Sequence, residues 1–529
     1  MPEYLAPGVY VEEVRTGPRP IEGVATSTAG FAGETERGST RPRLVTSWQD
    51  FTSHYGGYID RTPFNRSNHF LPYAVRGFFD NGGQRVFVAR VIGASSVAAA
   101  ISLDGNPGPT TLRAAGKGDW GNNILIAVTA AAASSPGDPP LVPLFRIQVA
   151  YYADGIRHPF VDPTDPSELA NPDRRTPDVF EEFDSLSADP TLPNFAKTVL
   201  NSASRLVEVL DCPGPPAAVS FPSARLNGGI YVQALRADYA GAASKDPEAR
   251  TGLAGLAAIR EIALMAVPDE VVINDLTSEL TGICDTLKDR FAIVSEPRPH
   301  AAVTLIHPVR DTSYGAMYYP WVRVAAPHTP TGTTLVPAAG HIAGIYARVD
   351  AERGVHKAPA NEVVQGIVIG NPTAGPLSHT VTRAEQEILN PRGVNVIRDF
   401  GGQRGAAHVW GARTMSSDPE WRYVNVRRLL VSIEQSIGRG TRWVVFEPNA
   451  DPTWSAVRTA INDFLRSLWR SGALMGRTQD EAFFVKCDRT TMTQDDIDEG
   501  RLICEVGVAP VRPAEFVILR FGQRTCVTA

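Results

Sequence analysis

The stretch that most constrains the fold of this chain is an amphipathic segment near its carboxyl end, DPTWSAVRTAINDFLRSLWRSGAL from Asp451. Asp451 is suited to cap a helix, and Pro452 fits the first helical position, where its missing N–H costs nothing. Apolar residues then recur at steps of three and four, which predicts a helix that ends near Ser471 and Gly472 and packs one face on a core. That face consists of Trp454, Val457, Ile461, Phe464, Leu465 and Leu468.

The other side of the same helix is basic. Arg458, Asn462, Arg466 and Arg470 recur every four residues, so three guanidinium groups form a ridge from the flank of the helix to its outer face. Such a ridge is suited to an acidic partner. The alternative interpretation is a solvated face that keeps the domain soluble.

The segment around this helix, residues 417–523, is typical of a compact α+β unit. A preceding helix from Val426 to Ile437 is expected to end at the glycines of residues 438–440. WVVFE from Trp443 predicts a buried strand, and two more strands are expected in EAFFVKCD from Glu481 and RLICEVGVAPV from Arg501.

Both chain ends carry strand-forming segments, although ends are normally polar and frayed. The first segment, GVYVEEV, contains Val9, Tyr10, Val11 and Glu12. The second, AEFVILRFGQ, contains Phe516, Val517, Ile518 and Leu519 and is apolar on both faces. A strand of that kind is expected to insert between other strands, in its own domain or in a neighbouring chain.

These residues resemble a known family. SSDPEWRYVNVRRLL, WVVFEPN, LWRSGALMG, AFFVKCDRTTMTQDDIDEGRL and APVRPAEFVILRFGQ are similar to the C-terminal domain of contractile tail sheath proteins, as found in contractile phages and extracellular contractile injection systems. PGVYVEE near the start is similar to the N-terminal arm of the family. YGAMYYPWVRV, GHIAGIYARVDAERGVHKAPANE and LNPRGVNVIRDF are similar to its middle domain.

The resemblance implies a structural subunit and no enzymatic activity. It implies hexameric rings stacked into a helical sheath around an inner tube, with baseplate and terminal cap proteins as further partners. By the same analogy, Arg458, Arg466 and Arg470 are expected to contact the inner tube, and the two end segments are expected to act as arms between subunits. Assembly is expected in the cytoplasm of the producing bacterial cell, within a phage tail or tail-like particle that lysis releases.

The composition agrees with a protein partner. The net charge of −6 argues against a general nucleic-acid binder. The five cysteines are odd in number and form no CxxC pair, so neither a disulfide framework nor a zinc site is indicated and they are interpreted as reduced thiols. No cofactor is expected. No apolar run reaches the roughly 18 residues needed to span a bilayer, and the start lacks the pattern of a signal peptide.

Residues 94–200 have a different texture, with short β-like runs split by Pro and Gly, which predicts an inserted β-rich outer domain. Gly116, Gly118 and Gly121 form a formal GxGxxG pattern. A strand, ILIAV from Ile124, is expected to follow it where a nucleotide site needs a helix, so we interpret the glycines as turn residues.

Helical and strand patterns alternate across residues 201–399, which predicts an α/β layer. The resemblance adds a subtilisin-like topology for this domain. Asp311, Ser313 and His341 could be proposed as a hydrolase triad, but no nucleophile elbow surrounds Ser313. A serine hydrolase and a monomeric surface-binding module remain the alternative classes.

The expected organisation is therefore a mixed α+β and α/β multidomain chain. Its parts are an N-terminal arm and linker (1–20), the first part of the core (21–93), the inserted domain (94–200), the α/β middle domain (201–399), the tube-facing α+β domain (400–513) and the C-terminal strand arm (514–529).

Overall fold

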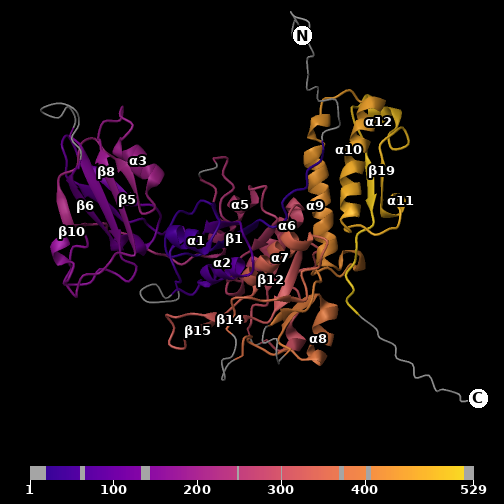
Figure 1. Ribbon diagram of the computed structural model, residues 1–529, viewed down its shortest axis with the longest axis horizontal. Coiled ribbons are helices and arrows are strands. Elements are labelled where there is room, and N and C mark those ends of the chain that lie inside the picture. Colours follow the sequence, from indigo (N-terminus) through magenta and orange to yellow (C-terminus); the bar gives the residue numbers. More distant parts are fainter. Residues whose placement is uncertain are drawn as a thin grey trace, which may run out of the picture. The chain divides into compact units, whose positions relative to one another are not determined.

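The computed structural model (Figure 1) describes residues 20–59, 66–132, 143–246, 249–299, 301–368, 375–400 and 407–516. The chain divides into two compact units, which are described separately below. Unit 1 comprises residues 1–24 and 428–529, and unit 2 comprises residues 25–427. The sequence had placed the boundary between the middle domain and the tube-facing domain at residue 400. This was wrong because strand β18 (His408–Val409) pairs with β17 (Val394–Arg398) in the central sheet of unit 2.

Unit 2 is built on a nine-stranded sheet in the order β16-β18-β17-β13-β12-β11-β1-β3-β2. The six strands from β17 to β3 are parallel, and β16, β18 and β2 add antiparallel edges. The inner strands are buried along their length, as expected when helices cover both faces of a parallel sheet. Besides β17 and β18, the strands are β1 (Ala29–Gly33), β2 (Arg43–Val45), β3 (Val86–Arg90), β11 (Leu264–Ala266), β12 (Phe291–Ser295), β13 (Gly315–Tyr319) and β16 (Glu362–Val363).

Helices lie on both faces of this sheet. Successive residues of β1 point to opposite faces of the sheet and so into two different apolar cores. Phe31 packs in the core formed with α1, α2 and α7, whereas Ala32 packs in the core formed with α4, α5, α6 and α8. A hairpin of β14 (Val322–Ala325) and β15 (Thr333–Val336) joins the first cluster. The helices are α1 (Trp48–Tyr55), α2 (Phe70–Asp80), α4 (Arg236–Ala240), α5 (Gly252–Ala257), α6 (Leu276–Leu287), α7 (Ala339–Arg353) and α8 (Arg383–Leu389). The predicted α/β alternation is confirmed.

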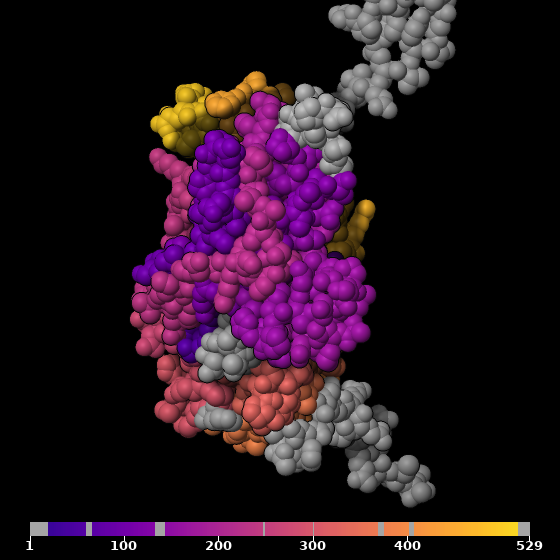
Figure 2. All heavy atoms as spheres, turned by 90° about the vertical axis from the view of Figure 1, so that its left-hand side faces the viewer, coloured from indigo at the N-terminus to yellow at the C-terminus, as the bar shows by residue number. Residues whose placement is uncertain are grey.

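The inserted domain consists of two antiparallel sheets and one helix, α3 (Ala196–Ala203). One sheet has the order β10-β6-β7-β8 and the other β4-β5-β9, and they enclose a common apolar core. The strands are β4 (Ala100–Leu103), β5 (Thr110–Ala114), β6 (Ile124–Ala130), β7 (Phe145–Tyr151), β8 (Val179–Leu186), β9 (Val207–Asp211) and β10 (Val219–Arg225). In Figure 2 this domain, purple and magenta, faces the viewer.

The predicted end of this domain at residue 200 was wrong, because β9 and β10 complete its two sheets. The sequences of β9 and β10 gave only a weak signal that they belong to this domain. β10 is an edge strand that contains Pro222, and proline in a strand is tolerated only where its missing N–H faces away from a ladder.

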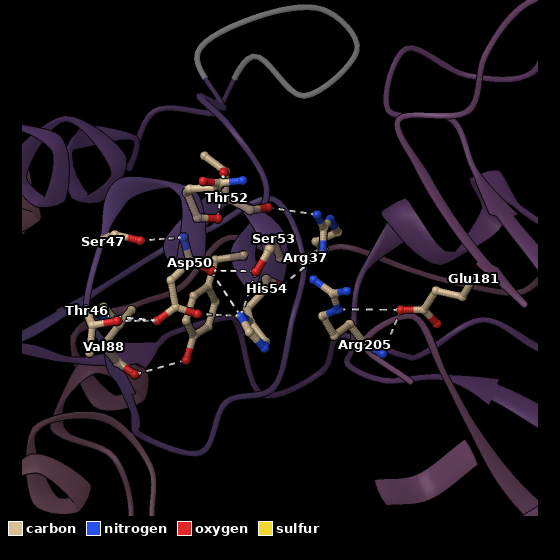
Figure 3. Close-up of polar contacts among 12 residues, drawn as sticks. Arg37, Thr46, Ser47, Asp50, Thr52, Ser53, His54, Val88, Glu181 and Arg205 are labelled. Atoms are coloured by element: carbon tan, nitrogen blue, oxygen red, sulfur yellow. Dashed lines mark hydrogen bonds and ion pairs between the residues drawn. The ribbon is translucent and has the colours of Figure 1, made fainter. Parts of the chain in front are cut away.

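Two neighbouring chain segments connect the inserted domain to the central sheet. Val97 and Ile230 exchange both backbone hydrogen bonds, at 2.9 and 3.0 Å. Polar contacts hold the domain in place: the Tyr151 hydroxyl donates to the buried Glu36 at 2.6 Å, and the buried Arg66 pairs with the exposed Asp119 at 2.8 Å. Figure 3 shows the same junction near α1, with His54 facing Arg205, which pairs with Glu181.

Unit 1 contains the carboxyl-terminal part of α9 (Val424–Gly440), α10 (Asp451–Arg470), α11 (Gln479–Ala482), α12 (Gln494–Asp498) and the antiparallel strands β19 (Phe483–Lys486) and β20 (Glu505–Val508). The helix and both strands predicted around α10 are confirmed. The strand predicted from Trp443 was wrong, because residues Arg442–Val444 form a short 3-10 helix. The turn after it exposes Val445 and Phe446, and Phe446 adopts a positive φ of 72°, which no strand allows.

Candidate assembly surface

α10 is the central helix of unit 1, and Figure 1 shows it between α9 and β19. Its predicted apolar face is buried through Trp454, Val457, Ile461, Phe464 and Leu465, and Ala460 lies on the same side. The Trp454 indole N–H donates to the Asn449 side chain at 2.8 Å. The cap differs from the prediction, since Ala450 is the N-cap and Asp451 is the first helical residue, where its carboxylate meets the positive helix end.

The three arginines predicted to form a ridge lie on α10 in different environments. Arg466 is half-buried and pairs with Asp463 at 2.8 Å, and it also donates to the Gln479 side chain at 3.1 Å. Arg458 is half-buried and reaches Ser455 at 3.4 Å. Arg470 is exposed at the end of the helix and has no ion pair with any described residue. Arg470 is therefore the arginine of the three with the most freely available charge.

The β19–β20 sheet has only two strands within the described ranges, so each strand has an edge with unpaired backbone groups. Phe483 lies opposite Val508, and Lys486 lies opposite Glu505. One side of the sheet packs on α10. A sheet of two strands is marginally stable alone and offers its edges to further strands.

Several large apolar side chains remain exposed in unit 1, which is unusual for a folded domain. The sequence had suggested buried positions for most of them, because they lie in apolar runs. These residues are Val445 (65% exposed), Phe446 (103%), Met475 (55%), Phe484 (49%), Ile503 (38%), Val506 (37%) and Phe516 (73%). In FFVK and EVGV, neighbouring apolar residues lie on opposite faces of the strand. This pattern was the sequence signal that apolar side chains would lie on both faces of the sheet.

The cysteines of this unit sit beside the sheet. Burial raises the pKa of the Cys504 thiol to about 12, and the neighbouring Cys487 also has a raised pKa for the same reason. Cys212, Cys284, Cys487 and Cys504 are all free, which agrees with the predicted reduced thiols. Cys526 lies outside the described residues.

The linker after the N-terminal segment is part of unit 1. Ile21 is buried against Gly440, where an added Cβ would lie 2.7 Å from the Ile21 side chain. The Val24 N–H donates to the Ser436 hydroxyl at 3.0 Å. These contacts bring the first described residues to α9, in the same unit as the β19–β20 sheet. The predicted arm residues Val9, Tyr10, Val11, Glu12, Val517, Ile518 and Leu519 lie outside the described residues.

The residues considered for catalysis and nucleotide binding have structural roles. Asp311 accepts hydrogen bonds from the backbone and side chain of Ser417. His341 is buried on α7, where burial lowers its pKa to about 4, and it forms no hydrogen bond with Asp311 or Ser313 in the described chain. Gly116 lies so close to Gly38 that a Cβ would sit 2.0 Å from its carbonyl oxygen.

A short 3-10 helix, Asp119–Asn123, precedes the strand predicted after the glycine pattern. No group of three or more His, Cys, Asp or Glu side chains in the described ranges is arranged to hold a metal ion. Among those same residues, no helix is long and apolar enough to cross a membrane.

Comparison with protein families gives two matches. The phage tail sheath protein central domain matches residues 242–415, and the phage tail sheath C-terminal domain matches residues 416–524. The chain is 27% identical over 179 residues to a prophage major tail sheath protein of Pseudomonas aeruginosa, a stretch that covers 34% of this chain and 44% of that protein. It is also 27% identical over 215 residues to the tail sheath protein of Salmonella phage ViI, covering 40% and 32% of the two chains. The matched stretches thus span less than half of these relatives.

Solved structures resemble the chain over nearly its full length. The sheath of an extracellular contractile injection system, PVC, in the contracted state has a TM-score of 0.56 at 23% identity and covers 99% of both chains. The helical sheath of the anti-feeding prophage in the contracted state has a TM-score of 0.55 at 25% identity, covering 99% of this chain and 100% of that one. The sheath tail protein of Listeria innocua has a TM-score of 0.57 at 13% identity, covering 93% and 96%.

Proposed function

Because this chain belongs to the contractile tail sheath family, we propose that it is the structural subunit of a contractile sheath, in a phage tail or an extracellular contractile injection system. The observation that carries the proposal is the match of both sheath domains along residues 242–524, together with a fold shared with two contracted sheaths over nearly the whole chain. The subunit would form hexameric rings, stacked helically around an inner tube and attached to baseplate and cap proteins. It would assemble in the bacterial cytoplasm and leave by lysis.

The exposed β19–β20 sheet supports a role in joining subunits. Strands from the N- and C-terminal segments of neighbouring chains would add to its free edges and bury part of its apolar surface. Each added backbone hydrogen bond would contribute a net of about 0.5–1.5 kcal/mol, so several of them outweigh a surface ion pair. The contacts of Ile21 and Val24 with α9 support this role, because they hold the linker that follows the N-terminal segment in the same unit as the sheet.

The arginines of α10 support a contact with an acidic inner tube. Each exposed pair would contribute only about 0.2–1 kcal/mol and would weaken with salt, but the contact repeats in every subunit. The central sheet, with six parallel strands and helices on both faces, supports the subtilisin-like topology that the family resemblance implies. A shared topology does not carry activity, and the proposal assigns no catalysis to this domain.

Electron microscopy of the purified full-length protein tests the proposal. We expect hollow cylinders with a helical surface, and a uniform population of small particles would contradict it. Deletion of residues 1–15, or truncation before Glu515, should yield subunits with a normal circular dichroism spectrum that no longer form cylinders. Normal contractile cylinders from either truncation would refute the arms and leave the sheath assignment intact. A misfolded product would show that the deleted strand completes its own domain, which also refutes the exchange between chains.

A further inference from the structure

Cys487 and Cys504 lie opposite each other at the end of the β19–β20 sheet. Lys486 lies opposite Glu505, so the next pair along the antiparallel register joins the two cysteines. Both thiols are free, and they are close enough that each changes the pKa of the other through a side-chain interaction. The guanidinium of Arg458 on α10 also acts on both thiols, as expected for two side chains on the same face of the sheet.

The register places this pair of cysteines where a disulfide fits. The Ala509 N–H donates to the Ala482 carbonyl at 2.9 Å, so these two opposed residues are a hydrogen-bonded pair. Hydrogen-bonded and non-hydrogen-bonded pairs alternate along an antiparallel ladder, which puts Cys487 and Cys504 at a non-hydrogen-bonded position. Opposed residues at such a position have Cα atoms about 4.5 Å apart. A disulfide spans Cα separations of about 4.4–6.8 Å, so the bond needs no large movement of the strands.

The chain between the two cysteines is ordered by hydrogen bonds that hold the strand ends together. The Thr491 hydroxyl donates to the Ile503 carbonyl at 2.9 Å, which joins the beginning of the connection to its end. The Asn449 side chain, which precedes α10, donates to the Arg501 carbonyl at 3.1 Å. The two thiols are therefore held in register before any covalent bond forms.

The two thiols differ in their access to solvent. Cys487 is 1% exposed, whereas Cys504 is half-buried. A small oxidant can therefore reach Cys504 first, and Cys487 lies in position to complete the exchange. Burial raises the pKa of Cys504 to about 12 and also raises the pKa of Cys487, so few thiolates form at neutral pH and the exchange is slow there.

We propose that Cys487 and Cys504 are a modification site, at which a low-molecular-weight disulfide such as oxidised glutathione converts them to a reversible disulfide. The Cys504 thiolate would attack one sulfur of the small disulfide and form a mixed disulfide, and the small thiol that leaves takes up the proton that Cys504 released. The Cys487 thiolate would then attack the Cys504 sulfur and release the second small thiol in the same way. Two protein thiols are oxidised, and one small disulfide is reduced to two thiols.

The proposal does not depend on sheath assembly, because both cysteines lie at the ends of two neighbouring strands of one chain. The bond would close the connection that carries α12 into a covalent loop. Closing such a loop restricts the unfolded chain and so stabilises the folded unit.

Mass spectrometry of the full-length protein after incubation with oxidised glutathione tests the site. Trypsin cleaves after Arg489 and Arg501, between the two cysteines, so the disulfide appears as a cross-linked pair of peptides. We expect this cross-link in most of the protein and its loss on treatment with dithiothreitol. Its rate of formation should rise about tenfold per pH unit from neutral to mildly alkaline pH, because the thiolate is the attacking species.

Three products would overturn the proposal. The first is a folded protein in which both thiols stay free under conditions that oxidise the unfolded chain. The second is a reaction that stops at glutathione bound to Cys504, and the third is a cross-link from Cys487 or Cys504 to Cys526.

Variants and thermal melts complete the test. Cys487→Ser separates the two steps, because its reaction should stop at the mixed disulfide on Cys504. Cys526→Ser is the matched control, since it keeps both cysteines of the pair and should form the cross-link as the original protein does. The cross-linked protein should melt at least about 2 °C higher than the reduced protein. A lower melting temperature, or an equal rise in oxidised Cys487→Ser, would contradict a disulfide that fits the folded sheet.

Discussion

At the scale of single residues, the most unusual groups are two adjacent buried carboxyls that follow β11. Asp269 is fully buried, and its pKa is raised to about 7 by burial, although it accepts from the Phe70 N–H and the Tyr239 hydroxyl. Burial raises the pKa of Glu270 to about 8, and its Oε1 accepts from the Ser295 N–H at 2.8 Å. Through these contacts both carboxyls fix the ends of neighbouring strands and the start of α2.

These pKa shifts predict a loss of stability as the pH rises from about 4 to about 8. The folded chain keeps both carboxyls protonated where the unfolded chain has released the protons. The stabilising contribution is therefore complete below about pH 4 and is lost as the pH rises through about 7 and 8. The melting temperature of the subunit should fall between about pH 4 and pH 8, with up to about 1.4 kcal/mol per pH unit from each group, and should level off above about pH 8, where both carboxyls are ionised in the folded chain as well.

Glu270→Gln should flatten this loss between about pH 4 and pH 8, because the amide oxygen retains the bond to Ser295 and nothing ionises. Thermal melts of the isolated subunit across the pH range measure the effect. Glu261→Gln, at an exposed residue paired with Arg85, is the matched control and should leave the slope unchanged. An identical slope in Glu270→Gln and in the original protein would mean that this carboxyl does not set the pH dependence.

At the scale of elements, α10 combines a stabilising face with an interaction face. Its apolar side packs in unit 1, and its arginines differ in how far they are engaged within the subunit. Arg466→Glu would remove the pair with Asp463, which is worth at most about 1 kcal/mol at a surface. Arg470→Glu removes no ion pair within the described chain and therefore isolates the effect on a partner.

If α10 faces the inner tube, Arg470→Glu should lower the yield of sheaths assembled around tubes, and the double change with Arg466→Glu should lower it further. The loss from the single change should be larger at low than at high salt, because salt screens both the attraction that the change removes and the repulsion that the new carboxylate introduces. Cosedimentation of sheath with tube measures the yield. Arg383→Glu on α8, exposed and paired with Glu387, is the control. Normal yield from the double variant would show that this helix is not the contact.

At the scale of the whole molecule, the inserted domain is a self-contained part of unit 2. Both of its sheets are formed entirely by its own strands, which share one core. The chain enters the domain at Val97 and leaves it at Ile230, and these two residues are paired. Residues paired in this way lie about 5.5 Å apart at their Cα atoms, so a very short linker can join them.

Replacing residues 98–229 with a short Gly-Ser linker should therefore leave a folded subunit that still assembles. Replacing only residues 94–200 should instead aggregate, because β9 and β10 would lose their partner strands. Size-exclusion chromatography and electron microscopy of both variants check this pair of outcomes. Loss of folded protein in the first variant would show that the inserted domain contributes to the core of the central sheet.

The sequence by itself determined the elements whose signal is local. The stripe from Trp454 to Leu465 predicted α10 because a 3.6-residue period needs no knowledge of distant partners. The strands ILIAV and EAFFVKCD and the helix before Gly438 were likewise set by their own patterns, and the two sheath domains were identified from contiguous motifs.

Only the tertiary structure decided the features that depend on distant partners. WVVFE has the composition of a strand, but no neighbouring strand pairs with it in the described part of unit 1, so it forms a short helix and an exposed turn. β10 carries a proline and becomes a strand because β6 supplies its ladder. Burial and hydrogen-bond satisfaction are properties of the packed chain, so no local pattern could reveal that the buried Tyr152 hydroxyl lacks a hydrogen-bond partner among the described residues.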